Sequence, residues 1–339
     1  MLGRTDIGFD LGTATVLAYI KGRGIVLREP AMVAVDVNTR NILAVGDEAR
    51  RMQGRTPPNV RVIRPLRDGS IVDFDILERM LRYFMHKIVG RRTLIRPYAV
   101  VCVPSGVTDM EKRSVVEAAL DAGARRTQLM DSAVAGALGA GLEVGEAYGS
   151  MLVDIGGGVT DISVVAMERA VVRTATQISG DLFDETIARY LRKKHNLMVG
   201  ERTAEEVKVT IGSVLRRTEQ LFMDVTGRNL VTGLPKTVRV NSDEISEALE
   251  EPLQGLVEQI QAVLERTPPE LAADIFDHGI TLIGGGAQLF GLDGALTHQL
   301  KIPCRLAEEP QACVCMGAGR SMEEGGGYER AMFTFRPGK

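Results

Sequence analysis

The stretches Asp10-Leu-Gly-Thr-Ala-Thr15 and Asp154-Ile-Gly-Gly-Gly-Val-Thr-Asp161 repeat one pattern, in which a short apolar run ends in an aspartate and a glycine-rich turn follows. Glycines in such a turn let backbone N–H groups close around phosphate oxygens. The aspartate at the strand end can hold a hydrated Mg²⁺ against those phosphates. A third glycine turn, Gly284-Gly-Gly-Ala287, completes the set. The pattern predicts a nucleotide held between two similar halves.

Two better-known glycine motifs do not fit these turns. Neither turn has the Gly-Lys-Ser/Thr ending of a P-loop, and neither has the G-x-G-x-x-G spacing of a dinucleotide-binding fold. Tight turns that bind nothing remain the alternative, although three such turns with strand-end aspartates rarely serve geometry alone.

Length and composition favour a globular protein with two lobes. A single core would be unusually large for 339 residues. Apolar residues make up 45% of the chain and charged residues 25%, which is enough to build a sizeable core. The net charge of −3 and the absence of a basic stripe argue against a nucleic-acid partner.

The four cysteines and the N-terminal sequence both favour a cytoplasmic protein. Cys102, Cys304, Cys313 and Cys315 lack the spacing of a zinc site, so reduced, buried thiols are expected. The N-terminus lacks a basic region followed by an apolar core, and no run approaches 18 apolar residues. We therefore expect neither secretion nor membrane spanning.

The order of the predicted elements is α/β. Residues 75–89 carry apolar side chains with a period near 3.6, which predicts a helix with one buried face. Ala99 to Val103 is typical of a strand covered on both faces, and Thr108-x-x-Glu111 after it is a capping box that opens a helix. A second strand, turn and helix unit runs from the Asp154 turn into a helix near Asp181.

Nine segments in order make the chain similar to the actin, Hsp70 and sugar kinase superfamily, and within it to the bacterial actins of the MreB/Mbl family. The segments are 24–30, 63–74, 101–104, 154–158, 180–185, 200–208, 227–229, 268–272 and 282–287. They cover nearly the full length. The resemblance implies an actin-like ATPase fold with two ribonuclease H-like lobes, each carrying a smaller inserted subdomain, and a nucleotide in the cleft between them.

The resemblance also implies where the lobes begin and end. Lobe I would span residues 1–144, with a small subdomain at about 32–64, and be completed by about 314–339. Lobe II would span 145–313, with a helical subdomain at about 181–249. Glycines between Gly139 and Gly149 mark the boundary, where hinge motion would follow.

The resemblance implies that the ligands are ATP and Mg²⁺ and assigns residues to them. The nucleotide-binding residues would be Gly12, Thr13, Ala14, Thr15, Gly156, Gly157, Gly158, Val159, Glu205, Lys208, Gly284, Gly285, Gly286 and Ala287. Asp10 and Asp154 would hold Mg²⁺ through water, the alternative being that they only cap their turns. Thr15 and Val159 depart mildly from the family, where Asn and Thr are usual.

Glu205 and Lys208 have a strong alternative explanation. The family's Glu-x-x-Lys implies contacts with base and ribose, but an i, i+3 pair of these residues is more often an exposed ion pair. Thr203-x-x-Glu206 also reads as a capping box, which would explain Glu206 by helix initiation.

The departure that matters most for chemistry is at Ser132. In the family a second Glu orients the attacking water here, and the alignment places Ser132 at that position with Asp131 just before it. A neutral, shorter serine cannot act as a carboxylate base, so hydrolysis should be slow unless Asp131 substitutes. Thr160 and Asp161 complete the predicted catalytic set.

One segment suggests a membrane contact. Leu94 and Ile95 lie in a predicted loop flanked by Arg91, Arg92 and Arg96. Apolar loop residues beside arginines can enter a bilayer interface while the arginines meet anionic head groups, as this loop does in the family. The alternative is that both apolar residues tuck under the lobe.

Three function classes remain open. The favoured one is an ATP-binding filament protein under the inner face of the cytoplasmic membrane, which helps determine cell shape by organising wall synthesis. Its partners would be itself, alone or with paralogues in a mixed filament, the anionic membrane and cell-wall synthesis proteins. A small-molecule kinase of the same superfold would need a carboxylate base aimed at a substrate hydroxyl. An Hsp70-like switch would need an added peptide-binding domain, which we do not expect in this chain.

Overall fold

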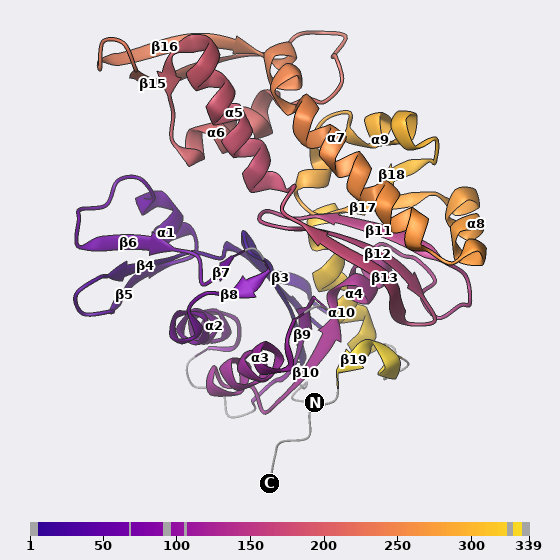
Figure 1. The fold of residues 1–339 in the computed structure, drawn as a ribbon. Helices are drawn as coiled ribbons and strands as arrows, with labels where there is room; N and C mark the ends of the chain where they lie inside the picture. The colour runs from indigo at the N-terminus through magenta and orange to yellow at the C-terminus, as the bar shows by residue number, and fades with distance from the viewer. Residues whose placement is uncertain (1–5, 68, 91–95, 105–106, 324–327, 334–339) are drawn as a thin grey trace.

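The computed structural model describes residues 6–67, 69–90, 96–104, 107–323 and 328–333. Two large sheets form its framework, and we call the parts built on them lobe I and lobe II (Figure 1). The lobe I sheet has the order β19-β10-β9-β1-β2-β3 and the lobe II sheet the order β13-β12-β11-β17-β18. Lobe I contains β1 (Asp6–Leu11), β2 (Thr15–Ile20), β3 (Gly24–Pro30), β9 (Tyr98–Val103), β10 (Arg126–Asp131) and β19 (Met332–Phe333). Lobe II contains β11 (Ser150–Ile155), β12 (Thr160–Ala166), β13 (Arg169–Thr176), β17 (Ile280–Ile283) and β18 (Cys304–Leu306).

The two sheets repeat one topology. In lobe I, β1 pairs antiparallel with β2 and parallel with β9. In lobe II, β11 pairs in the same way with β12 and β17. Asp10 and Asp154 are each the last residue but one of equivalent strands. The duplication expected from the two glycine turns is therefore confirmed.

Helices cover lobe I as the apolar pattern predicts. The expected helix at 75–89 is α2 (Phe74–Val89), whose apolar stripe is buried against the sheet. The capping box at Thr108 is confirmed at the start of α3 (Asp109–Asp121). The central strand β9 is buried from Ala99 to Val103, with α2 and α3 packed on one face.

Two helices separate the sheets. α4 (Ser132–Gly139) and α10 (Cys313–Glu323) pack on each other between lobe I and lobe II (Figure 1). Their core joins Val100 and Met130 of the first sheet to Leu152 and Ile283 of the second. Both lobes are thus tied to one pair of crossing helices.

Each lobe carries a smaller subdomain. On lobe I it contains β4 (Val33–Asp36), β5 (Ile42–Val45), α1 (Asp47–Met52) and β6 (Val60–Ile63), and the short strands β7 (Leu66–Arg67) and β8 (Ser70–Ile71) follow. On lobe II it contains α5 (Gly180–His195), β14 (Leu197–Met198), α6 (Glu201–Ile211), β15 (Phe222–Asn229), β16 (Pro235–Asn241) and the start of α7 (Ser242–Arg266). The expectation of a helical subdomain in lobe II is only half right, because β14, β15 and β16 form a sheet.

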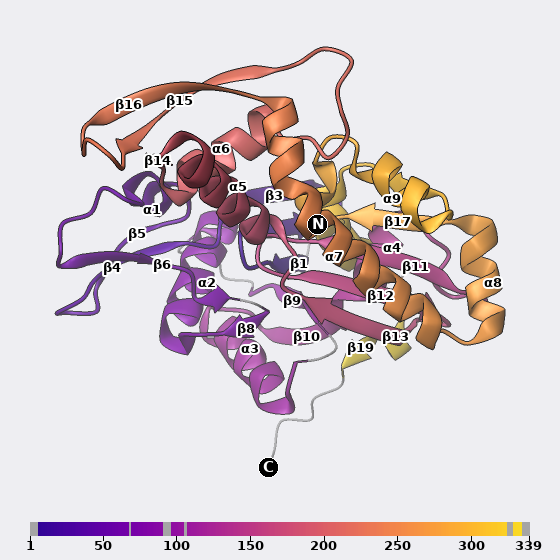
Figure 2. The same cartoon turned by 45° about the horizontal axis from the view of Figure 1, so that its top comes forward.

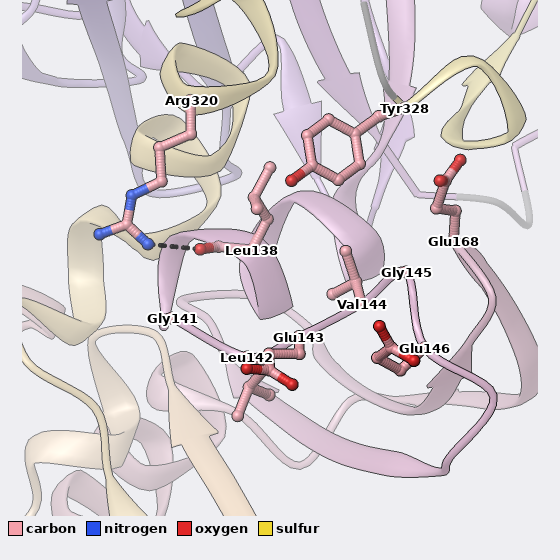
Figure 3. Close-up of a pocket in the computed structure, with 10 residues that line it drawn as sticks. All are labelled: Leu138, Gly141, Leu142, Glu143, Val144, Gly145, Glu146, Glu168, Arg320 and Tyr328. Carbon is pink, nitrogen blue, oxygen red and sulfur yellow. Dashed lines mark hydrogen bonds between the residues drawn. The ribbon is translucent and has the colours of Figure 1, made fainter. Parts of the chain in front are cut away.

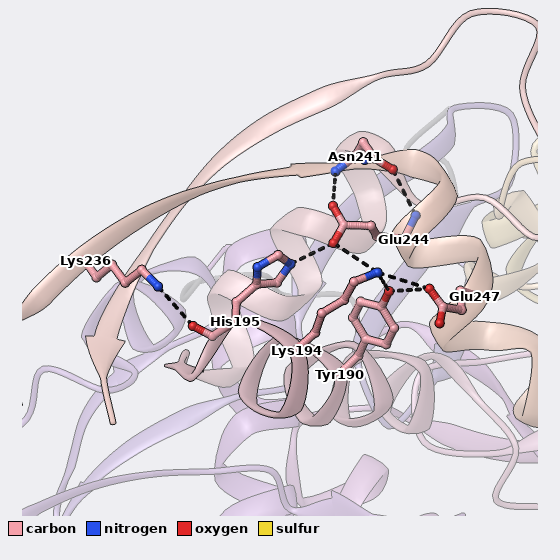
Figure 4. Close-up of polar contacts among 7 residues, drawn as sticks. All are labelled: Tyr190, Lys194, His195, Lys236, Asn241, Glu244 and Glu247. Carbon is pink, nitrogen blue, oxygen red and sulfur yellow. Dashed lines mark hydrogen bonds and ion pairs between the residues drawn. The ribbon is translucent and has the colours of Figure 1, made fainter. Parts of the chain in front are cut away.

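The β15–β16 hairpin lies along the outer side of α5 and α6 (Figure 2). Burial alternates along β15 and along residues 237–240 of β16, but only Val225 and Val240 are fully buried. Polar contacts help to attach α7 to α5 (Figure 4). Glu244 accepts from His195 at 2.7 Å, and Tyr190 donates to Glu247 at 2.5 Å.

Further helices cover lobe II, namely α7, α8 (Pro269–His278) and α9 (Leu292–Leu300), with short 3₁₀ turns at η1 (Gly286–Gln288), η2 (Pro310–Ala312) and, in lobe I, η3 (Glu329–Ala331). Among the described residues no helix combines the length and apolarity needed to cross a bilayer. All four cysteines are buried free thiols, as predicted.

Candidate functional site

A cavity of about 480 Å³ opens between the lobes, and the three glycine turns line it. Residues 12–15 come from the β1–β2 turn, Gly156, Gly157 and Val159 from the β11–β12 turn, and residues 284–286 from the turn after β17. Turns separated by more than 100 residues in the sequence therefore meet at one place. This is the arrangement that a ligand bound between two similar halves requires.

The first two turns touch each other across the cleft. The Gly158 N–H donates to Thr13 Oγ1 at 3.0 Å and so joins the two turns. The Gly156 N–H donates to the Val159 carbonyl at 3.0 Å and closes the second turn on itself. A Cβ on Gly157 would lie 2.4 Å from the Ala14 Cβ, so no larger residue fits without a shift. The backbones of both turns therefore lie together at one wall of the cavity.

The third turn packs on the end of β11. Gly284 has φ +86°, and a Cβ there would lie 2.4 Å from Asp154 Oδ1 and from the Ile155 carbonyl. Both the conformation and the space demand glycine. The close packing places this turn beside the strand-end aspartate.

Asp10 and Asp154 are partly buried carboxyls in the cleft. Burial raises the pKa of Asp10 to about 7. The pKa of Asp154 rises to about 8, first through burial and then through the negative charges of Asp10 and Asp161. A divalent cation bound here would stabilise the ionised form of both carboxyls against burial and against their mutual repulsion. Among the described residues no group of three or more His, Cys, Asp or Glu side chains could hold a metal ion.

These carboxyls predict a pH dependence of stability. In the unfolded chain they ionise near pH 4, whereas in the fold Asp10 and Asp154 keep their protons up to about pH 7 and 8. Unfolding therefore releases protons in this window, and stability falls as pH rises, by about 1.4 kcal/mol per pH unit for each carboxyl. Urea unfolding between pH 5 and 8 without Mg²⁺ or nucleotide measures this slope. Asp154→Asn should flatten it, and an unchanged slope in that variant would contradict the prediction.

Glu205 and Lys208 both line the cleft from α6. The Lys208 ammonium donates to the Gly180 carbonyl and to Asp184 Oδ2, both at 2.9 Å. Glu205 accepts from Arg50 of the lobe I subdomain at 2.7 Å, so it does not pair with Lys208. The alternative of a simple exposed ion pair between Glu205 and Lys208 is therefore wrong.

Three polar contacts join the two small subdomains over the cleft. Besides the Arg50–Glu205 pair, Gln53 donates to Glu201 at 3.0 Å. The third contact, from Arg64 to Asp181, measures 2.6 Å.

The expected capping box at Thr203 is wrong, because α6 begins at Glu201 after Gly200 and Thr203 lies inside the helix.

Lys208→Met is expected to destabilise the fold by about 3 kcal/mol at pH 7 and above, because it leaves Asp184 without its partner. The two side chains are only 15% and 13% exposed, and burial already raises the pKa of Asp184 to about 6. Asp184 Oδ1 is buried and has no hydrogen-bond partner among the described residues. Thermal unfolding measures the loss. Lys208→Met with Asp184→Asn should recover most of it, and failure to recover would show that the charge is not the cause.

The structure places two of the four predicted catalytic residues in the lining of the cleft and the other two outside it. Ser132, the first residue of α4, and Asp161 line the cleft. Asp131 and Thr160 are buried and do not line it. The Asp131 carboxylate accepts from the Ala133 N–H at 2.9 Å as the N-cap of α4, and the Thr160 hydroxyl donates to the Ile178 carbonyl at 2.6 Å. This geometry does not favour a catalytic role for either.

Sequence reasoning missed several residues of the cleft. Arg173, Asp184, Arg64 and Asp181 all line it. Asp181 and Asp184 fall in a segment that carried the resemblance, but no role was assigned to them. Of the predicted nucleotide residues, Gly158 and Ala287 support the turns without lining the cavity. Leu94 and Ile95 lie outside the described residues.

A second hollow of about 650 Å³ lies beside the end of α4 (Figure 3). Its polar lining includes Glu143, Glu146, Glu168 and Arg320, and Arg320 donates to the Leu138 carbonyl at 2.5 Å. Arg320 thereby satisfies a carbonyl at the C-terminal end of α4. The glycine turns and strand-end aspartates are in the other cavity, which we take as the functional site.

Comparisons with known proteins agree on one family. The family model described as MreB/Mbl protein matches residues 4–329. The chain is 46% identical to the cell shape-determining protein Mbl of Bacillus cereus over 94% of this chain and 96% of that protein. It is 45% identical to the cell shape-determining protein MreB of Escherichia coli over 94% of this chain and 93% of that protein.

Solved structures give the same result. MreB5 of Spiroplasma citri bound to ADP superposes with a TM-score of 0.90 at 34% identity, covering 95% of this chain and 97% of that one. The same protein bound to AMPPNP also superposes with a TM-score of 0.90. The MamK double helical filament, at 22% identity and a TM-score of 0.79, shares the fold.

Proposed function

This chain belongs to the MreB/Mbl family and has its actin-like fold, and we propose that it binds ATP and Mg²⁺ between its lobes and assembles into filaments that take part in determining cell shape. One observation carries the nucleotide part of the proposal. Three glycine turns from two lobes converge on one cavity that is also lined by two partly buried, strand-end aspartates. Relatives named for cell shape, and a relative solved with ADP and with AMPPNP, support it.

Each part of the cleft has a role in this proposal. Backbone N–H groups of the turns at residues 12–15 and 156–159, other than those of Gly156 and Gly158, bind phosphate oxygens. Asp10 and Asp154 hold Mg²⁺ through water. The metal, when bound, neutralises negative charge on the phosphates. Glu205 and Lys208 contact the ribose and base, while Gly284 to Ala287 lets the backbone approach the adenosine.

Binding would bring the lobes together. The nucleotide contacts turns from both lobes, and Glu205 is also bonded to Arg50 of the opposite subdomain. A ligand with more contacts in the closed form shifts the population toward it. We propose that the closed form is the one that polymerises, as a homopolymer or as a mixed filament with paralogues.

We also propose that the filament lies on the inner face of the cytoplasmic membrane and organises cell-wall synthesis proteins there. Leu94 and Ile95, flanked by arginines, would enter the bilayer interface. Two apolar residues contribute only a few kcal/mol per subunit. Repetition along a filament makes such weak contacts sufficient.

The first experiment is sedimentation of the purified protein with and without anionic liposomes, in ATP, ADP or a non-hydrolysable ATP analogue, with phosphate release followed in parallel. The proposal expects pelleting with ATP or the analogue, more of it with liposomes, and little phosphate. Leu94→Ser with Ile95→Ser should abolish only the liposome-dependent part, whereas Asp154→Ala should abolish all nucleotide dependence. No pelleting with any nucleotide, together with phosphate release that rises on adding a small hydroxylated substrate, would favour a kinase instead.

A further inference from the structure

Arg173 forms an ion pair inside the cleft that neither the glycine turns nor the family resemblance predicts. Its Nε donates to Asp161 Oδ1 at 2.9 Å, and its Nη2 donates to Asp161 Oδ2. Both side chains are only 15% exposed, and both line the cavity. The contact is a two-pronged guanidinium–carboxylate pair, the strongest and most directional kind of ion pair that side chains form.

The position of this pair follows from the strand register. Asp161 of β12 lies directly opposite Asp154 of β11. Two residues further along β12, Ser163 lies opposite Arg173 of β13. Ser163 donates to Asp161 Oδ1 at 2.9 Å, so hydrogen bonds from two strands fix that carboxylate. Asp161 is also close enough to Asp154 to raise its pKa. The guanidinium therefore lies near the carboxylate expected to hold Mg²⁺ against the phosphates.

We propose that Arg173 selects the triphosphate, by giving up part of its pair with Asp161 to bind oxygens of the terminal phosphate of ATP. This inference rests on the proposed nucleotide function of the cleft. A guanidinium binds carboxylate and phosphate oxygens with the same forked geometry and stays charged at any physiological pH. ADP has no third phosphate, so the contact contributes to ATP binding alone.

The pair with Asp161 prepares Arg173 for this role. The side chain is already ordered and largely removed from water, so little further conformational entropy is lost when a phosphate binds. Asp161 keeps its contact with Ser163 when the guanidinium turns. Arg173 also supplies a positive charge in a cleft where Asp10, Asp154 and Asp161 are negative when ionised.

The test is calorimetric titration with ADP and with AMPPNP, both with Mg²⁺, at a protein concentration at which light scattering shows no filaments. Arg173→Gln should weaken AMPPNP binding about 10- to 100-fold, the range for hydrogen bonds between charged groups. ADP affinity should change by less than about threefold. Arg173→Lys should recover part of the loss because it keeps the charge. The matched control is Arg169→Gln, the same charge change on an exposed residue at the other end of β13, and it should change neither affinity.

A double-mutant cycle separates phosphate binding from mere neutralisation of Asp161. If Arg173 contacts phosphate, Arg173→Gln still weakens AMPPNP binding in an Asp161→Asn background. If it only neutralises Asp161, its effect disappears there, and this result overturns the inference, as does an equal loss for ADP and AMPPNP. Failure of the wild-type protein to bind either nucleotide overturns the proposed function itself, and this inference with it.

Discussion

Ser132→Glu is expected to raise ATP hydrolysis by about 10²- to 10⁴-fold, the usual contribution of a positioned general base. Ser132 is the first residue of α4 and lines the cleft, whereas the Asp131 carboxylate is buried as the helix N-cap. A serine hydroxyl cannot take a proton from the attacking water. Glutamate at the same position adds the reach and the carboxylate that this step requires.

Phosphate release under single-turnover conditions measures the change, with AMPPNP affinity followed alongside. A glutamate in the first turn of α4 is favourable to the helix dipole, so the variant should fold. Ser132→Gln is the matched control, with the same length and no charge, and it should stay slow. Equal rates in the Glu and Gln variants would mean that length rather than basicity limits hydrolysis.

The two lobes and their glycine turns could be predicted because each turn is formed by residues that are close together in the sequence. Asp10, Asp154 and their glycines follow apolar strands directly, so residues a few positions apart determine both the strand ends and the ligand contacts. Ser132 was also found from the sequence, because the alanine- and glycine-rich segment at 135–142 can be aligned with the family. Such features need no knowledge of which strand lies beside which.

Contacts that depend on register or on closure could not be predicted. Arg173 reaches Asp161 only in the register that β12 and β13 adopt, and an irregularity between Val164 and Val165 sets that register near the hairpin turn. Arg50 meets Glu205 across 155 positions of sequence and two subdomains. The β15–β16 hairpin was missed because its alternating apolar stretches are short: only Met223 and Val225 in β15, and Val238 and Val240 in β16, pack against the core of lobe II.

Gly317→Ala and Gly139→Ala are each expected to lower the free energy of unfolding by at least about 3 kcal/mol, the range of the large core effects. A Cβ on Gly317 would lie 1.8 Å from the Ala135 carbonyl oxygen, and one on Gly139 would lie 1.7 Å from the Cys313 carbonyl oxygen. Each clash involves helix backbone, which cannot turn aside as a side chain would. α4 and α10 would have to separate.

The sign of this effect is opposite to the one that helix propensity gives. In an exposed helix, alanine in place of glycine stabilises by about 1 kcal/mol. Gly139 lies four residues after Ala135, whose carbonyl faces Gly317, and Gly317 lies four residues after Cys313, whose carbonyl faces Gly139. The lack of a side chain at both glycines therefore sets how closely α4 and α10 cross. The core between the two sheets is built on this crossing, so separating the helices also loosens the packing between the lobes.

Thermal and urea unfolding measure the loss, and Gly145→Ala provides the control, because nothing lies within 4 Å of a Cβ at that exposed position. The control should stay within about 0.5 kcal/mol of wild type. If all three variants behaved alike, the close crossing of α4 and α10 would not be what holds the lobes together. A loss confined to the two helix glycines would instead show that the close crossing of α4 and α10 stabilises the packing between the two sheets.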